Sequence, residues 1–189
     1  MSGYANFQVD ACGSDGLMNE ELCARWMQVG SFMPMYRAYH NRTYNVGADH
    51  FPSEPFEWWN FKSEEYKESI KSTIHFRMSY TRHIYNLMYL AQNYQLPIIT
   101  PHFFTDSTDA KAFEKPEHTF MVGRELKVTP VLEASKVEGA KQSSYFPKGV
   151  WYSLTDNTVE NVVTPEYREV ATSFAHPTLH MRDNSIVIF

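Results

Sequence analysis

The fold is decided by residues 9–40, which read V-D-A-C-G-S-D-G-L-M-N-E-E-L-C-A-R-W-M-Q-V-G-S-F-M-P-M-Y-R-A-Y-H. An apolar run ends at Asp10, which predicts that a buried strand ends there and passes into a loop. Asn19 is a favoured helix cap, and Glu20 and Glu21 follow it in the first turn, where the helix dipole stabilises negative charge. The stretch therefore begins as a strand and continues as a helix.

The remainder of this stretch completes one β-α-β unit. Leu22, Trp26 and Val29 recur at helical spacing, which predicts a stripe facing the core. Gly30 is a typical residue for the end of a helix. Residues 32–36 are again mostly apolar, and they predict a second strand parallel to the first.

Polar side chains follow both predicted strands. Asp10 ends the first strand, and Arg37 and His40 follow the second. In a β/α barrel the carboxyl ends of the strands form the active face. We therefore expect these three side chains to lie on one functional face.

Further motifs follow in a fixed order along the chain. They are S-E-P-F (53–56), R-M-S-Y-T-R-H-I-Y-N-L-M-Y (77–89), P-H-F-F (101–104), V-T-P-V-L (128–132), Y-F-P-K-G-V-W-Y (145–152) and H-M-R-D-N-S-I (180–186). Together with D-x-C-G and E-E-L-C-x-R-W-M-Q-x-G-x-F-x-P, they make the chain resemble glycoside hydrolase family 31, the retaining α-glucosidases. The resemblance is strongest to the animal lysosomal and intestinal type, and it covers nearly the whole chain.

This resemblance implies an α/β part followed by an all-β part. Residues 1–105 are expected to form the end of a (β/α)8 TIM barrel, and residues 106–189 an antiparallel β-sandwich. A complete barrel takes about 250 residues, whereas only about 95 residues here have a βα pattern. At most the last two units of a barrel are therefore expected.

The sequence after residue 62 supports this division. A helical pattern runs from Ser63 to about Tyr94, and its inward stripe is Tyr80, Ile84, Leu87 and Ala91. After Pro97 the pattern becomes alternating, which is typical of strands. The predicted strands are 98–104, 119–122, 126–132, 144–154, 159–163 and 179–189. The boundary between the two parts is expected between residues 105 and 118.

The resemblance also implies where the chemistry lies. A retaining glycosidase needs two carboxyl groups about 5–5.5 Å apart, one as nucleophile and one as acid and base. In this family both are aspartates on segments before D-x-C-G, and neither motif occurs in this chain, so no catalytic residue is predicted here. Asp10 corresponds to the wall of the glucose pocket, and Arg37 and His40 correspond to residues that contact sugar hydroxyls.

Three departures from the family pattern affect this assignment. Ser14 stands where the family usually has a phenylalanine, which removes an aromatic wall. R-A-Y-H is one residue longer than the expected R-N-H, so either His40 is displaced or Tyr39 takes its position. Asp183-Asn184 replaces a Gly-Gly turn, which these residues tolerate because they adopt left-handed conformations more readily than other non-glycine residues.

Cys12 and Cys23 are the two cysteines of the chain. Cysteines at matching places form a disulfide in the animal relatives that this chain resembles, and the alternative is two buried free thiols. A disulfide would indicate the secretory pathway, with a lysosomal or extracellular destination. Asn41-Arg42-Thr43 is a glycosylation sequon, although a glycan at Asn41 would crowd the pocket mouth beside His40.

Bulk properties exclude several classes of protein. The net charge of −5 provides no broad basic surface, which argues against a nucleic-acid partner. No apolar run is long enough to span a membrane, and the N-terminus has no signal-peptide pattern, although any such signal would lie upstream of this chain. Pro177 excludes a helix between His176 and His180, and no third ligand lies nearby, so no metal site is predicted. There is no Gly-rich phosphate loop, and no cofactor is predicted.

Two functions are consistent with these patterns. The first is part of an α-glucosidase in carbohydrate metabolism, inactive as an isolated chain, with an α-glucoside oligosaccharide and the missing barrel as its partners. The second is a catalytically inactive sugar-binding or interaction module. The loop of residues 41–61 contains aromatic residues that either stack on sugar rings or plug the barrel rim, namely Phe51, Phe56, Trp58 and Trp59. The stripe of Leu22, Trp26 and Val29 has no evident partner in the sequence. This favours the first function, in which the chain is part of a longer enzyme.

Overall fold

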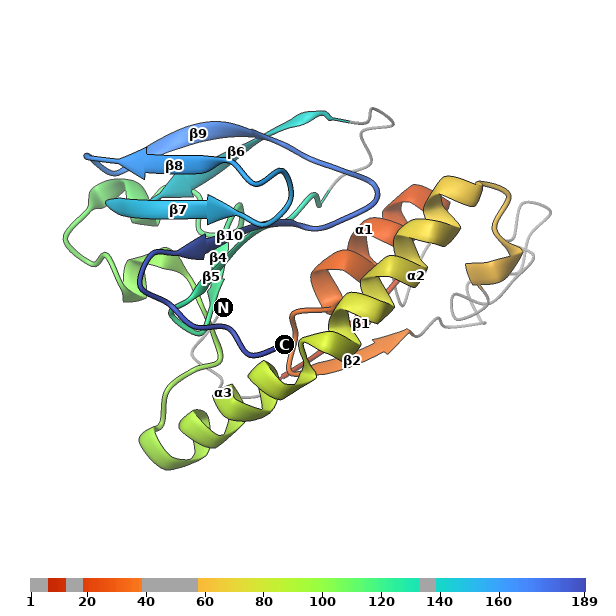
Figure 1. Cartoon of the computed structure of the whole chain (residues 1–189), viewed down its shortest axis with the longest axis horizontal. Helices are drawn as coiled ribbons and strands as arrows, with labels where there is room; N and C mark the ends of the chain where they lie inside the picture. The colour runs from red at the N-terminus through yellow and green to blue at the C-terminus, as the bar shows by residue number, and fades with distance from the viewer. Residues whose placement is uncertain (1–6, 13–18, 39–57, 133–138) are drawn as a thin grey trace.

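The computed structural model describes residues 7–12, 19–38, 58–132 and 139–189. Strands β1 (Gln8–Ala11) and β2 (Met35–Ala38) lie beside helices α1 (Glu20–Gly30) and α2 (Glu64–Ser79) in one part of the molecule. Antiparallel sheets form the other part (Figure 1). The order of the two parts agrees with the predicted α/β and all-β segments.

The predicted β-α-β unit is present. Strand β1 pairs with β2 in parallel, and this register places Asp10 opposite Arg37. Asn19 caps helix α1, because its side-chain oxygen accepts a hydrogen bond from the Leu22 N–H at 2.7 Å. The predicted cap is thus confirmed. Strand β1 ends one residue after Asp10, at Ala11, and β2 covers Met35–Ala38 where the sequence predicted residues 32–36, so Arg37 lies within the second strand and does not follow it.

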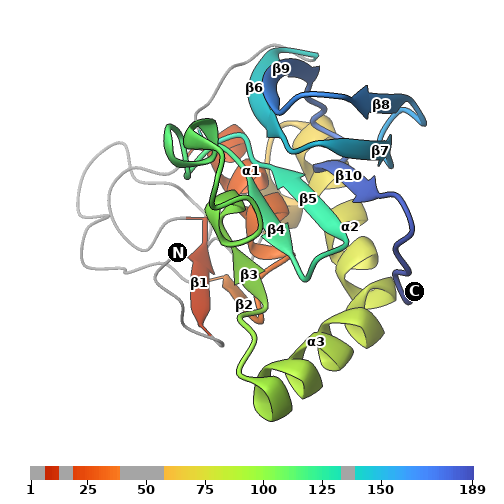
Figure 2. The same cartoon turned by 90° about the vertical axis from the view of Figure 1, so that its left-hand side faces the viewer.

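The predicted core stripe of α1 is correct only for Val29. Leu22 and Trp26 are half-buried, whereas the fully buried positions include Cys23, Met27 and two polar residues, Arg25 and Gln28. Helix α1 is covered on three sides, by the β1–β2 sheet, by α2 and by the β-sheet part (Figure 2). A second buried face made of polar side chains cannot be found from apolar periodicity.

The long predicted helix is divided in two at Tyr80, into α2 and α3 (Thr81–Tyr94). Tyr80 is fully buried and stacks on Phe76 with ring centroids 5.6 Å apart. Ser63 caps α2 as predicted, and the inward stripe is confirmed, since all four of its members are buried. The sequence analysis missed this break because the break depends on packing around the Tyr80 ring. Apolar periodicity carries no information about that packing.

Arg77 of α2 has a structural role. Its guanidinium donates hydrogen bonds to the carbonyl oxygens of Ser31, Met33 and Pro34, at 2.8 to 3.1 Å. These carbonyls lie just after α1, where backbone acceptors lack helical partners. Arg77 therefore attaches α2 to the turn that leads from α1 into β2.

The β part contains two antiparallel sheets among the described residues. One has the strand order β3-β4-β5-β10-β7-β8, and the other pairs β6 with β9. Buried residues from both sheets form one cluster, which contains Met121, Phe146, Trp151, Val162 and Val170. The strands are β3 (Ile99–Thr100), β4 (Phe120–Val122), β5 (Leu126–Thr129), β6 (Lys141–Phe146), β7 (Gly149–Ser153), β8 (Val159–Val162), β9 (Glu166–Ala171) and β10 (Thr178–Arg182).

The strand prediction is wrong in four places. Residues 144–154 are two strands, β6 and β7, and residues 98–104 are the short β3 followed by a 3-10 turn. Strand β9 was missed because its sequence, E-Y-R-E-V-A, is mostly polar. Strand β10 ends at Arg182, before the predicted end, and Asn184 beyond it has a left-handed φ of 56°, as the Asp-Asn turn predicted. Strand β3 pairs with β4, and the division at residue 105 stays a prediction.

A buried polar contact joins the two parts. Arg25 donates to the Ser173 carbonyl at 2.6 Å, and Gln28 donates to the Phe174 carbonyl at 2.8 Å. The Arg25 guanidinium also lies 4.2 Å from the centre of the Phe174 ring, and Ser72 donates to the Ala175 carbonyl at 2.7 Å. Helices α1 and α2 therefore bind the backbone of the segment between β9 and β10.

Three buried bases lie inside the β part. Lys127 is fully buried, donates to Ser144 Oγ at 2.5 Å, and lies 3.6 Å from the centre of the Phe146 ring. Burial lowers the pKa of Lys127 well below its usual range. Burial and the nearby Lys127 charge lower the pKa of His102 and of His180 to about 3 each.

We expect Arg25→Met to lower the free energy of unfolding by about 2 to 3 kcal/mol, because a charged donor to a buried carbonyl is lost. Glu21 would also lose the cation that lies 3.8 Å away in a buried environment. Urea unfolding measures the change. Arg82→Met, at an exposed arginine of α3, is the matched control and should change stability by less than about 0.5 kcal/mol. Equal effects of the two substitutions would contradict this role for Arg25.

The buried histidines predict that acid destabilises the β part. Their pKa values are lower in the folded state than in the unfolded chain, so their contribution is intact above about pH 6.5 and is lost as the pH falls toward 3. As the pH falls through that range, each histidine should lower the free energy of unfolding by about 1.4 kcal/mol per pH unit. Thermal melts between pH 7 and 4 test this. His180→Leu should flatten the pH slope, whereas His176→Gln, at an exposed histidine, should not.

Candidate functional site

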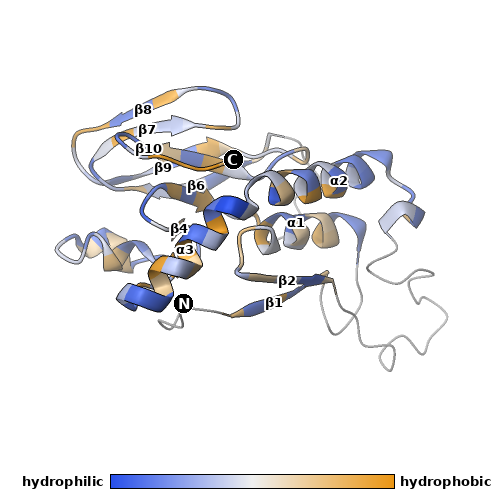
Figure 3. Ribbon diagram, turned by 60° about the horizontal axis from the view of Figure 1, so that its bottom comes forward, coloured by the Kyte–Doolittle hydropathy of each residue, from blue (hydrophilic) through white to orange (hydrophobic). Residues whose placement is uncertain are grey.

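The candidate site is the uncovered face of the β1–β2 sheet. Side chains alternate between the two faces of a strand. Val9, Ala11, Tyr36 and Ala38 pack toward the helices. Figure 3 shows α1 and α2 on that side of the sheet, and none of the described helices or strands covers the other side. The open face therefore carries the alternate residues, which are Gln8, Asp10, Met35 and Arg37.

Asp10 and Arg37 form an ion pair on this face. Arg37 Nε donates to Asp10 Oδ1 at 2.8 Å, and Arg37 Nη2 lies 2.7 Å from the same oxygen. The Asp10 side chain is 24% exposed and that of Arg37 is 51% exposed, so both remain accessible. Two of the three predicted binding residues are thus brought together at the carboxyl ends of adjacent parallel strands, as the sequence analysis expected.

Gln8 is a third polar residue on this face, and the sequence analysis missed it. Its Nε2 donates to Asp10 Oδ1 at 3.1 Å. Strand alternation was the signal that could have found it, because Gln8 and Asp10 are two positions apart in one strand. The prediction considered only residues at the strand ends.

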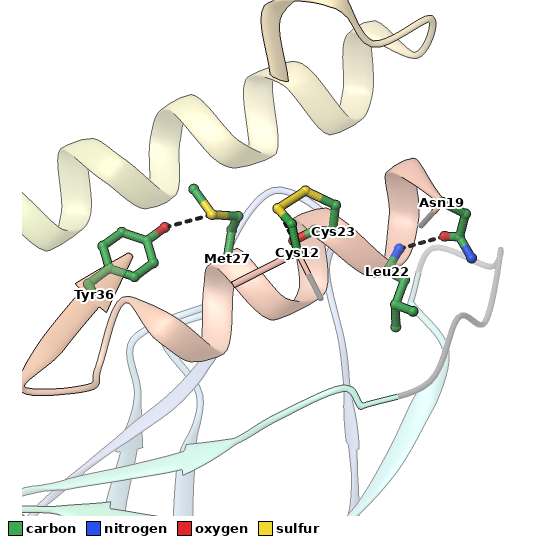
Figure 4. The surroundings of a disulfide bond; sticks show 6 residues. All are labelled: Cys12, Asn19, Leu22, Cys23, Met27 and Tyr36. Carbon is green, nitrogen blue, oxygen red and sulfur yellow. Dashed lines mark hydrogen bonds between the residues drawn. A yellow bond between two sulfur atoms is a disulfide. The ribbon is translucent and has the colours of Figure 1, made fainter. Parts of the chain in front are cut away.

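The predicted disulfide joins the end of β1 to helix α1. The Cys12 and Cys23 sulfurs are bonded, and their Cα atoms are 4.0 Å apart (Figure 4). Cys12 has a φ of 71°, a conformation that non-glycine residues rarely adopt and that surrounding structure must hold. Next to this bridge, Tyr36 of β2 donates to the Met27 sulfur of α1 at 3.2 Å. Both strands are thereby attached to one helix near Asp10 and Arg37.

Helix α1 also organises the start of α2. The Glu20 carboxylate accepts hydrogen bonds from the backbone N–H groups of Lys62, at 2.6 Å, and Ser63, at 3.0 Å. Trp58 and Trp59 lie just before this point, with ring centroids 5.9 Å apart, and Trp59 is 54% exposed. These two are the members of the predicted aromatic loop that the structure describes.

The other predicted residues of the site lie outside the described residues. They are His40, its alternative Tyr39, the sequon residue Asn41, Ser14, Phe51 and Phe56. Among the described residues, no three His, Cys, Asp or Glu side chains come together as a metal-binding group. Within the same part of the chain, no helix is long and apolar enough to cross a membrane.

Comparison with known families identifies the two parts of the chain. The model of the glycosyl hydrolases family 31 TIM-barrel domain matches residues 1–87, and that of the family 31 C-terminal domain matches residues 95–187. The chain belongs to glycosyl hydrolase family 31. Membership confirms the family predicted from the motifs.

Relatives of this family 31 chain include several glucosidases. It is 32% identical to an uncharacterized family 31 glucosidase of Schizosaccharomyces pombe, over 99% of this chain and 18% of the relative. It is 31% identical to the lysosomal alpha-glucosidase of Mus musculus, over 87% and 16%, and 33% identical to a probable alpha-glucosidase of Oryza sativa, over 82% and 16%. The chain thus spans less than a fifth of the length of these curated relatives.

Solved structures show the same fold. A cycloalternan-forming enzyme from Listeria monocytogenes, in complex with a pentasaccharide substrate, matches 98% of this family 31 chain and 17% of its own, with a TM-score of 0.83 and 18% identity. A GH31 alpha-xylosidase from a soil metagenome, complexed with xylose, matches 97% of this chain and 28% of its own, with a TM-score of 0.77 and 22% identity.

Removal of the disulfide should lower the stability of the β1–α1 connection. We expect Cys12→Ser combined with Cys23→Ser to lower the free energy of unfolding by about 3 kcal/mol, since the bridge closes a loop of 11 positions in the unfolded chain. Urea unfolding with and without dithiothreitol measures this. The double variant should be insensitive to the reductant, and a wild-type protein equally insensitive to it would contradict a stabilising disulfide.

Proposed function

We propose that this chain is the carboxyl-terminal end of the (β/α)8 barrel, together with the following β-sandwich domain, of a retaining α-glucosidase. Its substrate is the terminal α-linked glucose of an oligosaccharide, and its role belongs to carbohydrate metabolism. The observation that carries this proposal is the Asp10–Arg37 pair on an uncovered sheet face. The family 31 match of residues 1–87 to a TIM-barrel domain supports the placement of that face inside a barrel.

The strand edges support a partner for this sheet. Strands β1 and β2 pair with each other, and neither has a second neighbour among the described residues. Unpaired strand edges carry backbone groups that bond readily to further strands. The partner is the rest of the barrel, and we place the nucleophilic and the acid–base aspartate on it, upstream of Asp10.

In this arrangement Asp10 and Arg37 bind the sugar and the upstream carboxylates perform the chemistry. A carboxylate accepts hydrogen bonds from sugar hydroxyls, and the bond is strengthened by its charge. Arg37 holds the carboxylate in place and provides donors of its own. By the family resemblance, His40 or Tyr39 is a further sugar-binding residue. Without the nucleophile and the acid, the isolated chain binds glucose weakly and hydrolyses no glycoside.

The compartment follows from the disulfide and the relatives. Disulfides persist in oxidising compartments. The relatives include lysosomal alpha-glucosidases of Mus musculus and Rattus norvegicus. We place the protein in the secretory pathway, with a lysosomal or extracellular destination.

The test uses a polypeptide in which this chain continues from the rest of its barrel. We expect Asp10→Asn to lower kcat/KM for maltose by about 10- to 100-fold, because a charged acceptor for the sugar is lost. Glu65→Gln, at an exposed carboxylate of α2, is the matched control and should leave kcat/KM unchanged. Initial rates of glucose release measure both.

Two outcomes would contradict the proposal. If the joined polypeptide binds maltose but releases no glucose, the protein is the inactive sugar-binding module instead. If the isolated chain hydrolyses maltose by itself, the catalytic carboxylates lie within it, and their proposed upstream position is wrong.

A further inference from the structure

Gln8 lies beside the candidate sugar-binding carboxylate. It precedes Asp10 by two positions in β1, so the two side chains lie on the same face of the strand. Gln8 is exposed, and Met35, opposite it in the sheet, is 50% exposed. A glutamine on an open face is often an ordinary solvated residue. Gln8 differs from such a residue because its amide donates a hydrogen bond to Asp10.

The hydrogen bonds of Asp10 are unequally distributed between its two oxygens. Oδ1 lies within 3.1 Å of three nitrogens, which are Gln8 Nε2, Arg37 Nε and Arg37 Nη2. None of the described residues bonds Oδ2. A carboxylate held through one oxygen by donors from two strands has a defined orientation, and its second oxygen remains available as an acceptor.

Gln8 and Arg37 hold Asp10 from different directions. Arg37 reaches Oδ1 from the neighbouring strand, whereas Gln8 reaches it from within β1, about 6.6 Å closer to the strand's amino end. In a barrel the amino ends of the strands lie farther from the active face. Gln8 therefore supports Asp10 from below, on the side away from the pocket mouth.

We propose that Gln8 is a positioning residue of the sugar site, which orients the Asp10 carboxylate so that Oδ2 accepts a hydroxyl of the terminal glucose. This inference rests on the proposed function. Gln8 acts through Asp10 and lies below the sugar. Its amide is suited to this role because it donates a hydrogen bond without adding charge next to the Asp10–Arg37 pair.

The test compares variants of Gln8 in the joined polypeptide, with maltose as substrate. Gln8→Leu removes the donor and keeps a similar volume, and it should raise KM about tenfold with kcat changed less than about twofold, since a ground-state contact is weakened. Gln92→Leu is the matched control, because Gln92 is an exposed glutamine of α3 and lies outside the β1–β2 sheet. It should leave KM unchanged.

Gln8→Glu provides a readout that a merely structural role would not move. When protonated, the introduced carboxyl donates to Asp10 as the amide does, so KM should be close to that of wild type near pH 4. When ionised, it repels Asp10, and KM should rise more steeply with pH than in wild type. Arg37 and Asp10 are the other charged residues on this face in the described strands.

The outcomes separate this inference from the function on which it rests. Activity in wild type with equal KM values for Gln8→Leu and Gln92→Leu, or a pH profile of Gln8→Glu parallel to wild type, would overturn the role of Gln8 alone. A wild-type polypeptide that neither binds nor hydrolyses maltose would overturn the proposed function, and the role of Gln8 with it.

Discussion

The buried contact of Arg25 and Gln28 with the backbone of residues 173–174 is the interaction on which the arrangement of the molecule depends. A buried guanidinium is unfavourable unless its charge is paired and its donors are bonded. Here the Glu21 carboxylate, the Ser173 carbonyl and the Phe174 ring surround it. These groups come from helix α1 and from the segment between β9 and β10. The contact therefore holds the two family domains together.

Helix α1 is therefore shared by three layers of the structure. One side contacts β1 and β2, with the disulfide to Cys12 and the Tyr36–Met27 contact. Another side packs on α2, and a third holds the β part through Arg25. A rigid support of this kind suits a binding site, because the geometry of Asp10 and Arg37 then depends on packed elements. The β part stabilises the site without contributing a described residue to it.

The open face of the β1–β2 sheet carries polar side chains that contact one another, and no other described helix or strand covers it. Its apolar side is covered by α1 and α2, whereas its polar side carries an ion pair supported by a glutamine. In a soluble domain an uncovered parallel sheet is unusual, since parallel sheets are normally covered on both faces. This asymmetry is explained if the polar side faces the interior of a barrel that the rest of a longer polypeptide completes.

The sequence by itself determined the local elements of this protein and its family. The cap at Asn19 and the start of α2 at Ser63 follow from residues close together in the chain. The shared face of Asp10 and Arg37 follows from the β-α-β pattern. The pairing of Cys12 with Cys23 came from the family resemblance, and the structure contains it.

The tertiary structure alone decided the buried role of Arg25, the break at Tyr80, the polar strand β9 and the bond from Gln8 to Asp10. Most of these depend on partners far away in the sequence, such as Ser173, which is 148 positions from Arg25. Propensity and periodicity describe how a segment behaves alone, whereas a buried charge, a helix break or a polar strand is stabilised only by the groups that the fold brings to it.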